Sequence, residues 1–307
     1  MFSPKNVLKR YDDAEQDALL DFLLEKAVPA VVEVPKLVQA IDNLAEAKEL
    51  VARKGEIIGL STGFKSIDRM TVGMAPGDLI IVYGDTSHGK SQLTQNITYR
   101  IARKGEKVLF VGLEMTNAQN TTRFLVIGQG DYKLEYTLRN ILYPHDNNLN
   151  LSSLEPLVAQ GAESNARLVI IDQLQQLVRS IENNTNETSM ITHELKRLAI
   201  KYQLPIILIS HINRSGQTSA APNLRELKGS SSIEQDADIC IAVWRDKSAD
   251  ALQPDTLEVW LRKNRNRGME FIQSDLLVQN GVRLIEPGIS ETPLALSVFP
   301  DGQIQTN

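Results

Sequence analysis

The chain of 307 residues has little of what several protein classes require. It contains a single cysteine, Cys240, so an intrachain disulfide is impossible. That residue lies in the apolar run Asp238-Ile-Cys-Ile-Ala-Val243, which favours a buried and unreactive thiol. No apolar run approaches the length of a membrane span, and the N-terminus has no signal-peptide hydrophobic core. These absences predict a soluble, intracellular protein with no membrane partner.

Excess positive charge is also missing. The sequence has 33 Lys and Arg against 38 Asp and Glu, a net charge of −5. This balance does not suggest a protein that binds nucleic acid over its whole surface, although a narrow channel needs only a local basic patch. Apolar residues make up 42% of the chain, enough for a sizeable core in one large or two ordinary domains.

One motif stands out in what is present. Residues 84–91 read Gly84, Asp85, Thr86, Ser87, His88, Gly89, Lys90 and Ser91, and Gln92 follows. This is the G-x-x-x-x-G-K-[ST] pattern of a phosphate-binding loop. An apolar run precedes it and a helical pattern follows it, which is the order the motif needs. The motif predicts ATP binding, with Lys90 at the β- and γ-phosphates and Ser91 on Mg²⁺.

Strand-like and helical patterns alternate from residue 60 onward. The predicted strands are 79–83, 108–113, 168–171, 206–210, 239–244 and 256–261, and the predicted helices are 92–102, 117–128, 151–160 and 188–202. This alternation predicts an α/β fold with a mostly parallel sheet covered on both faces. Polar stretches at 183–188 and 214–222 predict mobile loops.

The first 58 residues are expected to form a separate helical region. Helices are predicted over 13–27 and 34–54, and the second carries an apolar stripe made of Val34, Leu37, Val38, Ile41, Leu44 and Val51. The stripe could pack internally or dock on a neighbouring subunit, and the sequence favours neither. Residues 59–286 are predicted to be the ATPase domain, and residues 287–307 a tail without a motif.

Two carboxylates end predicted strands and supply candidates for metal binding and catalysis. Asp172 follows Leu168-Val-Ile-Ile, so it is expected at the carboxyl edge of the sheet, where it would hold Mg²⁺ through water. Glu114 follows the strand that begins at Val108 and would polarise the attacking water. The alternatives are an ordinary loop-start acid for Asp172 and a helix-capping acid for Glu114.

Three polar features lie further along the chain. His211 ends the strand Pro205-Ile-Ile-Leu-Ile-Ser and could either bind the γ-phosphate or be structural. The run from Trp260 to Gly268 holds four cations, of which Lys263 and Arg265 could reach a neighbouring subunit's nucleotide or simply form a solvated hairpin tip. The flexible loop predicted at 227–238 could bind a phosphate of single-stranded nucleic acid or be plain surface; its candidate contacts are Lys228 with the backbone of Gly229, Ser230, Ser231 and Ser232.

Taken together and in this order, these motifs resemble the C-terminal motor domain of the DnaB-type replicative helicases. The resemblance covers roughly residues 60–284 and includes Gly112-Leu-Glu-Met115, Ser230-Ser-Ser-Ile-Glu-Gln-Asp-Ala-Asp238, Trp244-Arg-Asp246 and Lys263-Asn-Arg-Asn266. It implies a RecA-like, superfamily 4 fold and a hexameric ring that hydrolyses ATP between subunits. It also implies single-stranded DNA, and possibly a primase and a helicase loader, as partners during DNA replication. The cytoplasm of a bacterium or of a phage-infected cell is the expected location.

The sequence departs from the family pattern at two places. His211 stands where the family has Gln, although both side chains can hydrogen-bond a phosphate. Lys228 stands where the bacterial members have the phosphate-binding Arg, and a second register through Leu224-Arg-Glu-Leu227 makes Arg225 another candidate. Residues 1–58 are shorter than the family's collar and linker and resemble the linker alone.

Two other functions fit a RecA-like core. One is a recombinase or regulatory ATPase of the RecA family, which assembles on DNA without unwinding it. The other is an assembly protein that uses ATP only to lock an oligomer. The run from Ser230 to Asp238 and the Lys263 and Arg265 pair favour the helicase, and the full set of catalytic candidates argues against the assembly protein.

Overall fold

The structure is a computed structural model that describes residues 39–45, 48, 57, 59–146, 149–178, 184–212, 221–227, 230–246, 255–265 and 272–288. Contacts divide the chain into two compact units, Met1–Ala52 and Arg53–Asn307. In the first unit the turn η1 (Ala40–Asn43) leads into helical residues, and Ile41 and Leu44 are exposed. The predicted helix over 13–27 and the tail from 289 lie outside the described residues, as does most of the predicted helix over 34–54.

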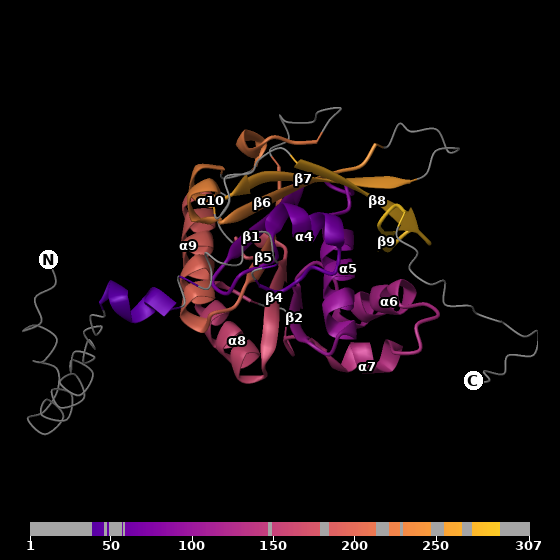
Figure 1. The fold of residues 1–307 in the computed structure, drawn as a ribbon, viewed down its shortest axis with the longest axis horizontal. Coiled ribbons are helices and arrows are strands. Elements are labelled where there is room, and N and C mark those ends of the chain that lie inside the picture. The colour runs from indigo at the N-terminus through magenta and orange to yellow at the C-terminus, as the bar shows by residue number, and fades with distance from the viewer. Residues whose placement is uncertain are drawn as a thin grey trace, which may run out of the picture. The chain divides into compact units, whose positions relative to one another are not determined.

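Nine strands of the second unit form one sheet in the order β3-β2-β4-β5-β1-β6-β7-β8-β9 (Figure 1). Six of them pair in parallel: β1 (Leu79–Gly84), β2 (Lys107–Gly112), β3 (Ile141–Leu142), β4 (Ala166–Asp172), β5 (Ile206–His211) and β6 (Ile239–Trp244). The remaining three are antiparallel: β7 (Thr256–Asn264), β8 (Ile272–Gln279) and β9 (Arg283–Ile285). The predicted α/β fold with a mostly parallel sheet is confirmed.

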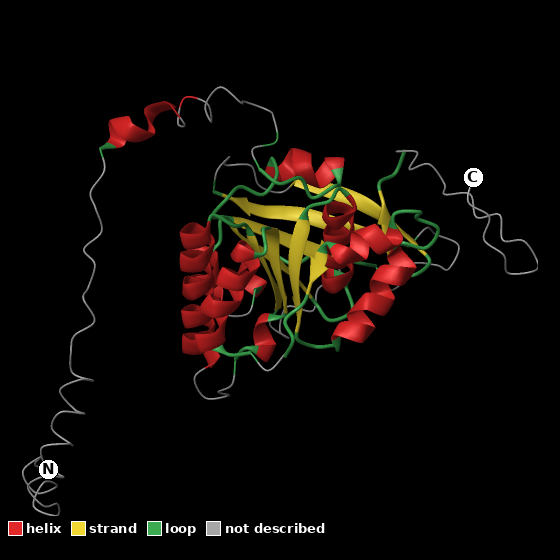
Figure 2. Cartoon of the chain, turned by 90° about the horizontal axis from the view of Figure 1, so that it is seen from below, coloured by secondary structure: helices red, strands yellow, loops and turns green. Residues whose placement is uncertain are grey.

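Helices cover both faces of this sheet (Figures 1 and 2). One face carries α4 (Lys65–Thr71), α5 (Lys90–Arg103), α6 (Asn117–Ile127) and α7 (Leu134–Arg139). The other carries α8 (Leu151–Glu163), α9 (Asn184–Tyr202) and α10 (Ser230–Asp236). The central strand β1 alternates between two cores, because Ile80 and Val82 pack towards α5 while Leu79, Ile81 and Tyr83 pack towards α9. Strands buried on both faces explain the nearly continuous apolar runs.

The structure corrects two predicted loops. Helix α9 begins at Asn184, so most of the loop predicted over 183–188 is helical, and α10 occupies much of the loop predicted over 227–238. Both segments are rich in Ser, Thr and Asn, whose low helix propensity is overridden by tertiary packing. Ile233 of α10 is fully buried against the core that α9 covers. The elements α4, α7, β3, β8 and β9 were not predicted from the sequence.

Two predictions made from composition concern a membrane-spanning helix and the reactivity of Cys240. Within the described residues no helix combines the length and apolarity needed to cross a bilayer. Cys240 is buried in β6, and this burial raises the pKa of its thiol to about 12. A thiol with such a pKa is protonated at neutral pH and therefore unreactive as a nucleophile.

Asp238 ties three elements of the second unit together just before β6. Its carboxylate accepts hydrogen bonds from the Leu79 backbone N–H at 2.8 Å and from Lys196 Nζ at 2.6 Å. Its backbone N–H donates to the Leu79 carbonyl at 2.9 Å. The Asp238 side chain is 6% exposed and that of Lys196 is 18% exposed, so the pair is shielded from water.

Replacing Asp238 by Asn should therefore lower the free energy of unfolding by about 3 kcal/mol, because the Lys196 ammonium would lose its counter-charge in a buried setting. Chemical denaturation measures this loss. Arg167→Gln is the control, since Arg167 faces Glu106 at 3.8 Å in an exposed pair and its loss should leave stability almost unchanged. Equal stability of Asp238→Asn and wild type would contradict the prediction.

Candidate functional site

The register of the parallel strands gathers the predicted nucleotide residues at one edge of the sheet. Gly84, the last residue of β1, lies opposite His211 of β5. Gly112, the last residue of β2, lies opposite Asp172 of β4. Ligands of open α/β sheets bind outside the carboxyl ends of the strands. The phosphate loop, both carboxylates and His211 therefore share the edge where a ligand is expected.

The phosphate loop is shaped by two glycines that no other residue could replace without movement. A Cβ on Gly84 would lie 2.5 Å from the carbonyl oxygen of Val243 in the neighbouring strand β6. Gly89 has a φ of 90°, in the left-handed region that favours glycine, directly before α5 begins at Lys90. The helix N-terminus thus points its partial positive charge at the loop.

Lys90 is buried, and its Nζ lies at the centre of this loop. It donates to the carbonyl oxygens of Gly84 at 3.0 Å and Asp85 at 2.8 Å. The same Nζ also lies 3.1 Å from His211 Nδ1, within hydrogen-bond distance. An ammonium group only donates, so Nδ1 accepts and the imidazole proton lies on Nε2. His211 is therefore a hydrogen-bond donor beside the lysine of the phosphate loop.

Asp172 is almost fully buried, at 4% exposure. Burial raises the pKa of its carboxyl to about 6, a rise that the negative charge of Glu114 supports and that Ser91 and Lys90 oppose. Its Oδ1 is buried without a hydrogen-bond partner among the described residues. A buried carboxylate oxygen left in this way is costly unless a cation or donor joins it.

Glu114 is exposed, and its Oε1 accepts a hydrogen bond from Gln173 Nε2. Gln173 is a residue that sequence reasoning missed, because a glutamine after a strand-terminal aspartate belongs to no motif. A second missed contact comes from the end of β6, where the Arg245 backbone N–H donates to His88 Nδ1 at 3.1 Å. The His88 and Trp244 rings lie 6.4 Å apart, so the loop is also supported from that side.

Lys263 and Arg265, called the finger cations below, lie at the other ends of the parallel strands, where those strands begin. Because β7 runs antiparallel to β6, its end at Asn264 pairs with Ile239, the first residue of β6. A strand of β6's length spans about 20 Å. Lys263 Nζ donates to the carbonyl oxygens of Ala237, at 2.7 Å, and Glu234. Arg265 contacts the Gln235 carbonyl and, at 3.4 Å, the Asp238 carboxylate.

The predicted DNA contacts are only partly described. Lys228 and Gly229 lie outside the described residues, and Ser230 and Ser231 form the start of α10. Arg225 is exposed in the turn η4 (Leu224–Glu226). A backbone bridge pairs Ile212, the residue after His211, with Leu227, the residue before Lys228.

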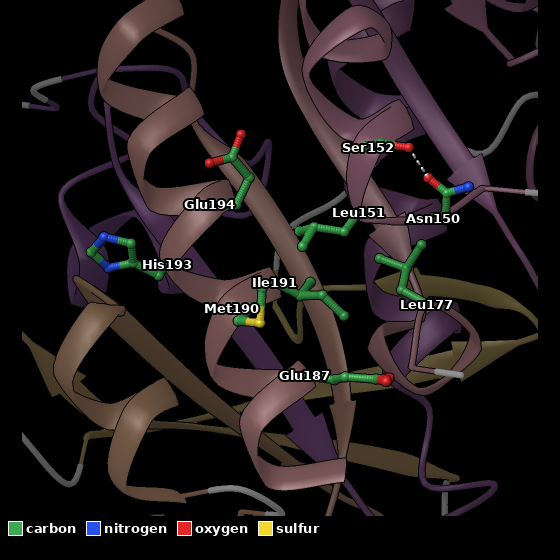
Figure 3. A pocket seen from close by; sticks show the side chains of 9 residues that line it. All are labelled: Asn150, Leu151, Ser152, Leu177, Glu187, Met190, Ile191, His193 and Glu194. Carbon is green, nitrogen blue, oxygen red and sulfur yellow. Dashed lines mark hydrogen bonds between the residues drawn. The ribbon is translucent and has the colours of Figure 1, made fainter. Parts of the chain in front are cut away.

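A separate cavity of about 850 Å³ lies between the start of α8, the turn η2 (Leu174–Gln176) and α9 (Figure 3). It is lined by Asn150, Leu151, Ser152, Leu177, Glu187, Met190, Ile191, His193 and Glu194. None of the residues predicted to contact ATP or DNA is among them. The predicted site and this cavity are therefore different features of the domain.

The close approach at Gly84 generates a test of the loop geometry. Gly84→Ala should weaken nucleotide binding by about tenfold or more, because the new methyl group would push β1 and the phosphate loop away from Val243. Equilibrium titration with a fluorescent ATP analogue measures this effect, and circular dichroism shows whether the fold persists. An unchanged affinity in a folded variant would show that the loop tolerates the displacement.

Comparison with known proteins identifies relatives of this domain. The sequence matches the DnaB-like helicase C terminal domain family over residues 59–136 and 135–277. It is 31% identical over 297 residues to the replicative DNA helicase DnaB of Geobacillus stearothermophilus, covering 83% of this chain and 64% of that protein. The chain therefore spans less than two thirds of the length of this relative.

Solved structures give the same answer for the fold. A solved ATPase domain matches with a TM-score of 0.71 and 23% identity, covering 81% of this chain and 99% of that one. A DnaB-like replicative helicase, described with its interactions with primase, matches with a TM-score of 0.69 and 20% identity, covering 92% and 78%. The chain belongs to the DnaB-like helicase family, of which it carries the RecA-like ATPase domain.

Proposed function

We propose that this chain is the motor of an ATP-dependent DNA helicase that acts in DNA replication. It would form a ring, with six subunits expected, hydrolyse ATP at the subunit interfaces and translocate on single-stranded DNA. One observation carries the proposal: the phosphate loop and carboxylates lie at one edge of the sheet, and the finger cations lie at the other. A site divided in this way is completed by a second subunit.

ATP would be held by the phosphate loop, with Lys90 at the β- and γ-phosphates and Ser91 and Asp172 on Mg²⁺. The unpartnered Oδ1 of Asp172 supports this assignment. Mg²⁺ usually takes one or two carboxylates together with substrate phosphates. The described residues contain no cluster of three or more His, Cys, Asp or Glu that could hold a metal by themselves, in keeping with a cation that arrives with the nucleotide.

Glu114 would accept a proton from the attacking water, and His211 would donate from Nε2 to the γ-phosphate. The positions of the two residues support these assignments. Glu114 lies two residues beyond the carboxyl end of β2, and His211 Nδ1 accepts a hydrogen bond from Lys90 of the phosphate loop. The bridge between Ile212 and Leu227 supports a route from His211 to the DNA-binding loop at Lys228. A phosphate contact from Lys228 would move along the strand without reading its sequence.

Lys263 and Arg265 would act on the nucleotide of the neighbouring subunit. Their place at the far edge makes their own phosphate loop unreachable without a large rearrangement of β7. An arginine supplied in trans can accelerate phosphoryl transfer by roughly 10³–10⁵.

Further partners are proposed from the family. A primase is one, because the matching DnaB-like helicase is described with its interactions with primase; a helicase loader is another. Docking of the N-terminal apolar stripe, which includes Ile41 and Leu44, on a neighbouring subunit is proposed with them. The recombinase alternative shares the fold, but no contact described above favours it over the helicase.

Two variants separate nucleotide binding from hydrolysis. Lys90→Ala should abolish both, because the cation at the phosphates is lost. Glu114→Gln should still bind ATP but turn it over about 10²–10⁴ times more slowly, which is the usual contribution of a general base. Neither should unwind a forked DNA substrate that the wild-type protein unwinds.

Steady-state ATPase assays with single-stranded DNA and fluorescence unwinding assays measure these effects. Glu135→Gln is the matched control, because Glu135 is exposed on α7. Hydrolysis by Glu114→Gln at the wild-type rate would refute the role of Glu114. DNA-stimulated hydrolysis by the wild type without unwinding would favour the recombinase or regulatory ATPase.

Subunit mixing tests the role of Arg265 in trans. Arg265→Ala subunits and Lys90→Ala subunits should each be nearly inactive alone. In mixed rings, some interfaces combine an intact phosphate loop from the first variant with an intact Arg265 from the second, so partial ATPase activity should return. Mixtures of Lys90→Ala with Glu114→Gln are the control, because no interface then has an intact loop and carboxylate together. Absence of recovery, with subunit exchange verified by fluorescence, would place Arg265 in cis or in a structural role.

A further inference from the structure

The proposed function leaves one contact at the site unused, a hydrogen bond between Gln173 and Glu114. Gln173 directly follows Asp172, and its side chain is buried, at 3% exposure. Its Nε2 donates to Oε1 of Glu114, which is itself exposed. A buried amide is therefore aimed outward at the carboxylate proposed to activate water.

The register of the sheet explains why these two side chains meet. Strands β2 and β4 are neighbours, and Gly112 lies opposite Asp172. One residue further along the first of them, the Leu113 N–H donates to the Asp172 carbonyl at 2.6 Å, so the pairing continues one residue beyond the end of β2. Gln173 follows directly with an extended backbone, φ −145° and ψ 168°, as the residue before the turn η2.

The chemistry of the contact suits a carboxylate that must accept a proton. A free, exposed glutamate samples several rotamers, and each orients its two oxygens differently. A hydrogen bond to Oε1 selects one orientation and leaves Oε2 for the water. The donor is a neutral amide, so the carboxylate keeps its full charge, whereas a lysine or arginine there would neutralise it.

We propose that Gln173 is a positioning residue for ATP hydrolysis, which holds the Glu114 carboxylate in the orientation that activates water. The proposal rests on the proposed role of Glu114. It adds a residue that acts through Glu114 and does not touch the nucleotide. Three glutamines near this turn differ in surroundings: Gln173 contacts Glu114, Gln175 Nε2 donates to Ser210 Oγ at 3.2 Å, and Gln176 is exposed.

The test combines Gln173→Met, which keeps the length of the side chain but has no donor, with Glu114→Gln in a double-mutant cycle. Gln173→Met alone should lower kcat by about tenfold, the scale of one hydrogen bond to a charged group, with the affinity for a fluorescent ATP analogue unchanged. In the Glu114→Gln background it should change the single-turnover rate by less than about twofold, because the group it acts through is gone. Gln176→Ala is the matched control and should behave as wild type.

Three results would overturn the proposal: a wild-type kcat for Gln173→Met, a parallel loss of ATP affinity, or a full tenfold loss in the Glu114→Gln background. Gln173→Glu replaces the donor by an acceptor of the same shape and serves if the methionine variant does not fold; it should show the same loss of kcat. A wild-type rate for Glu114→Gln alone would instead refute the proposed function, so the two failures are distinguishable.

Discussion

Parallel pairing of the central strands is the constraint on which the rest of this domain depends. Four neighbours in the sheet, β2, β4, β5 and β1, all run in the same direction. Each ends at the same edge, so residues far apart in sequence arrive together. Lys90 and His211 are 121 residues apart and lie 3.1 Å from one another. No local interaction could bring them together, and the burial of apolar runs on both faces is what stabilises the arrangement.

The first reversal of direction across the sheet, between β6 and β7, has the opposite consequence. It carries Lys263 and Arg265 to the amino edge of the parallel strands, away from the phosphate loop of the same chain. Under the proposed function the catalytic candidates are divided between the two ends of the parallel strands, so a monomer would lack a complete site. Assembly would then be a chemical requirement of the proposed function, because the carboxyl ends of the strands in one subunit would have to meet the amino ends in the next.

The sequence was informative where one interaction dominates and uninformative where several compete. Buried parallel strands need unbroken apolar runs, so all six predicted strands were found, and the phosphate loop followed from its spacing. Helix α10 was predicted as a loop because Ser230-Ser-Ser has poor helix propensity, and the burial of Ile233 decides its structure instead. The contact of Gln173 with Glu114 could not be predicted, because it depends on the register between β2 and β4, which no motif encodes.

The contacts of the finger cations within their own subunit do not oppose a role in trans. Lys263 and Arg265 bind backbone carbonyls at the C-terminal end of α10, where the helix dipole favours cations, and Arg265 also lies 3.4 Å from the Asp238 carboxylate. At an exposed helix end such a contact contributes only about 0.3–1 kcal/mol, and the Arg265 side chain is 48% exposed. A nucleotide phosphate carries a full negative charge and accepts stronger, charge-assisted hydrogen bonds than a carbonyl oxygen does. Under the proposed function, the contacts within the subunit would hold both side chains in order before assembly, and a phosphate presented by a neighbouring subunit would replace them.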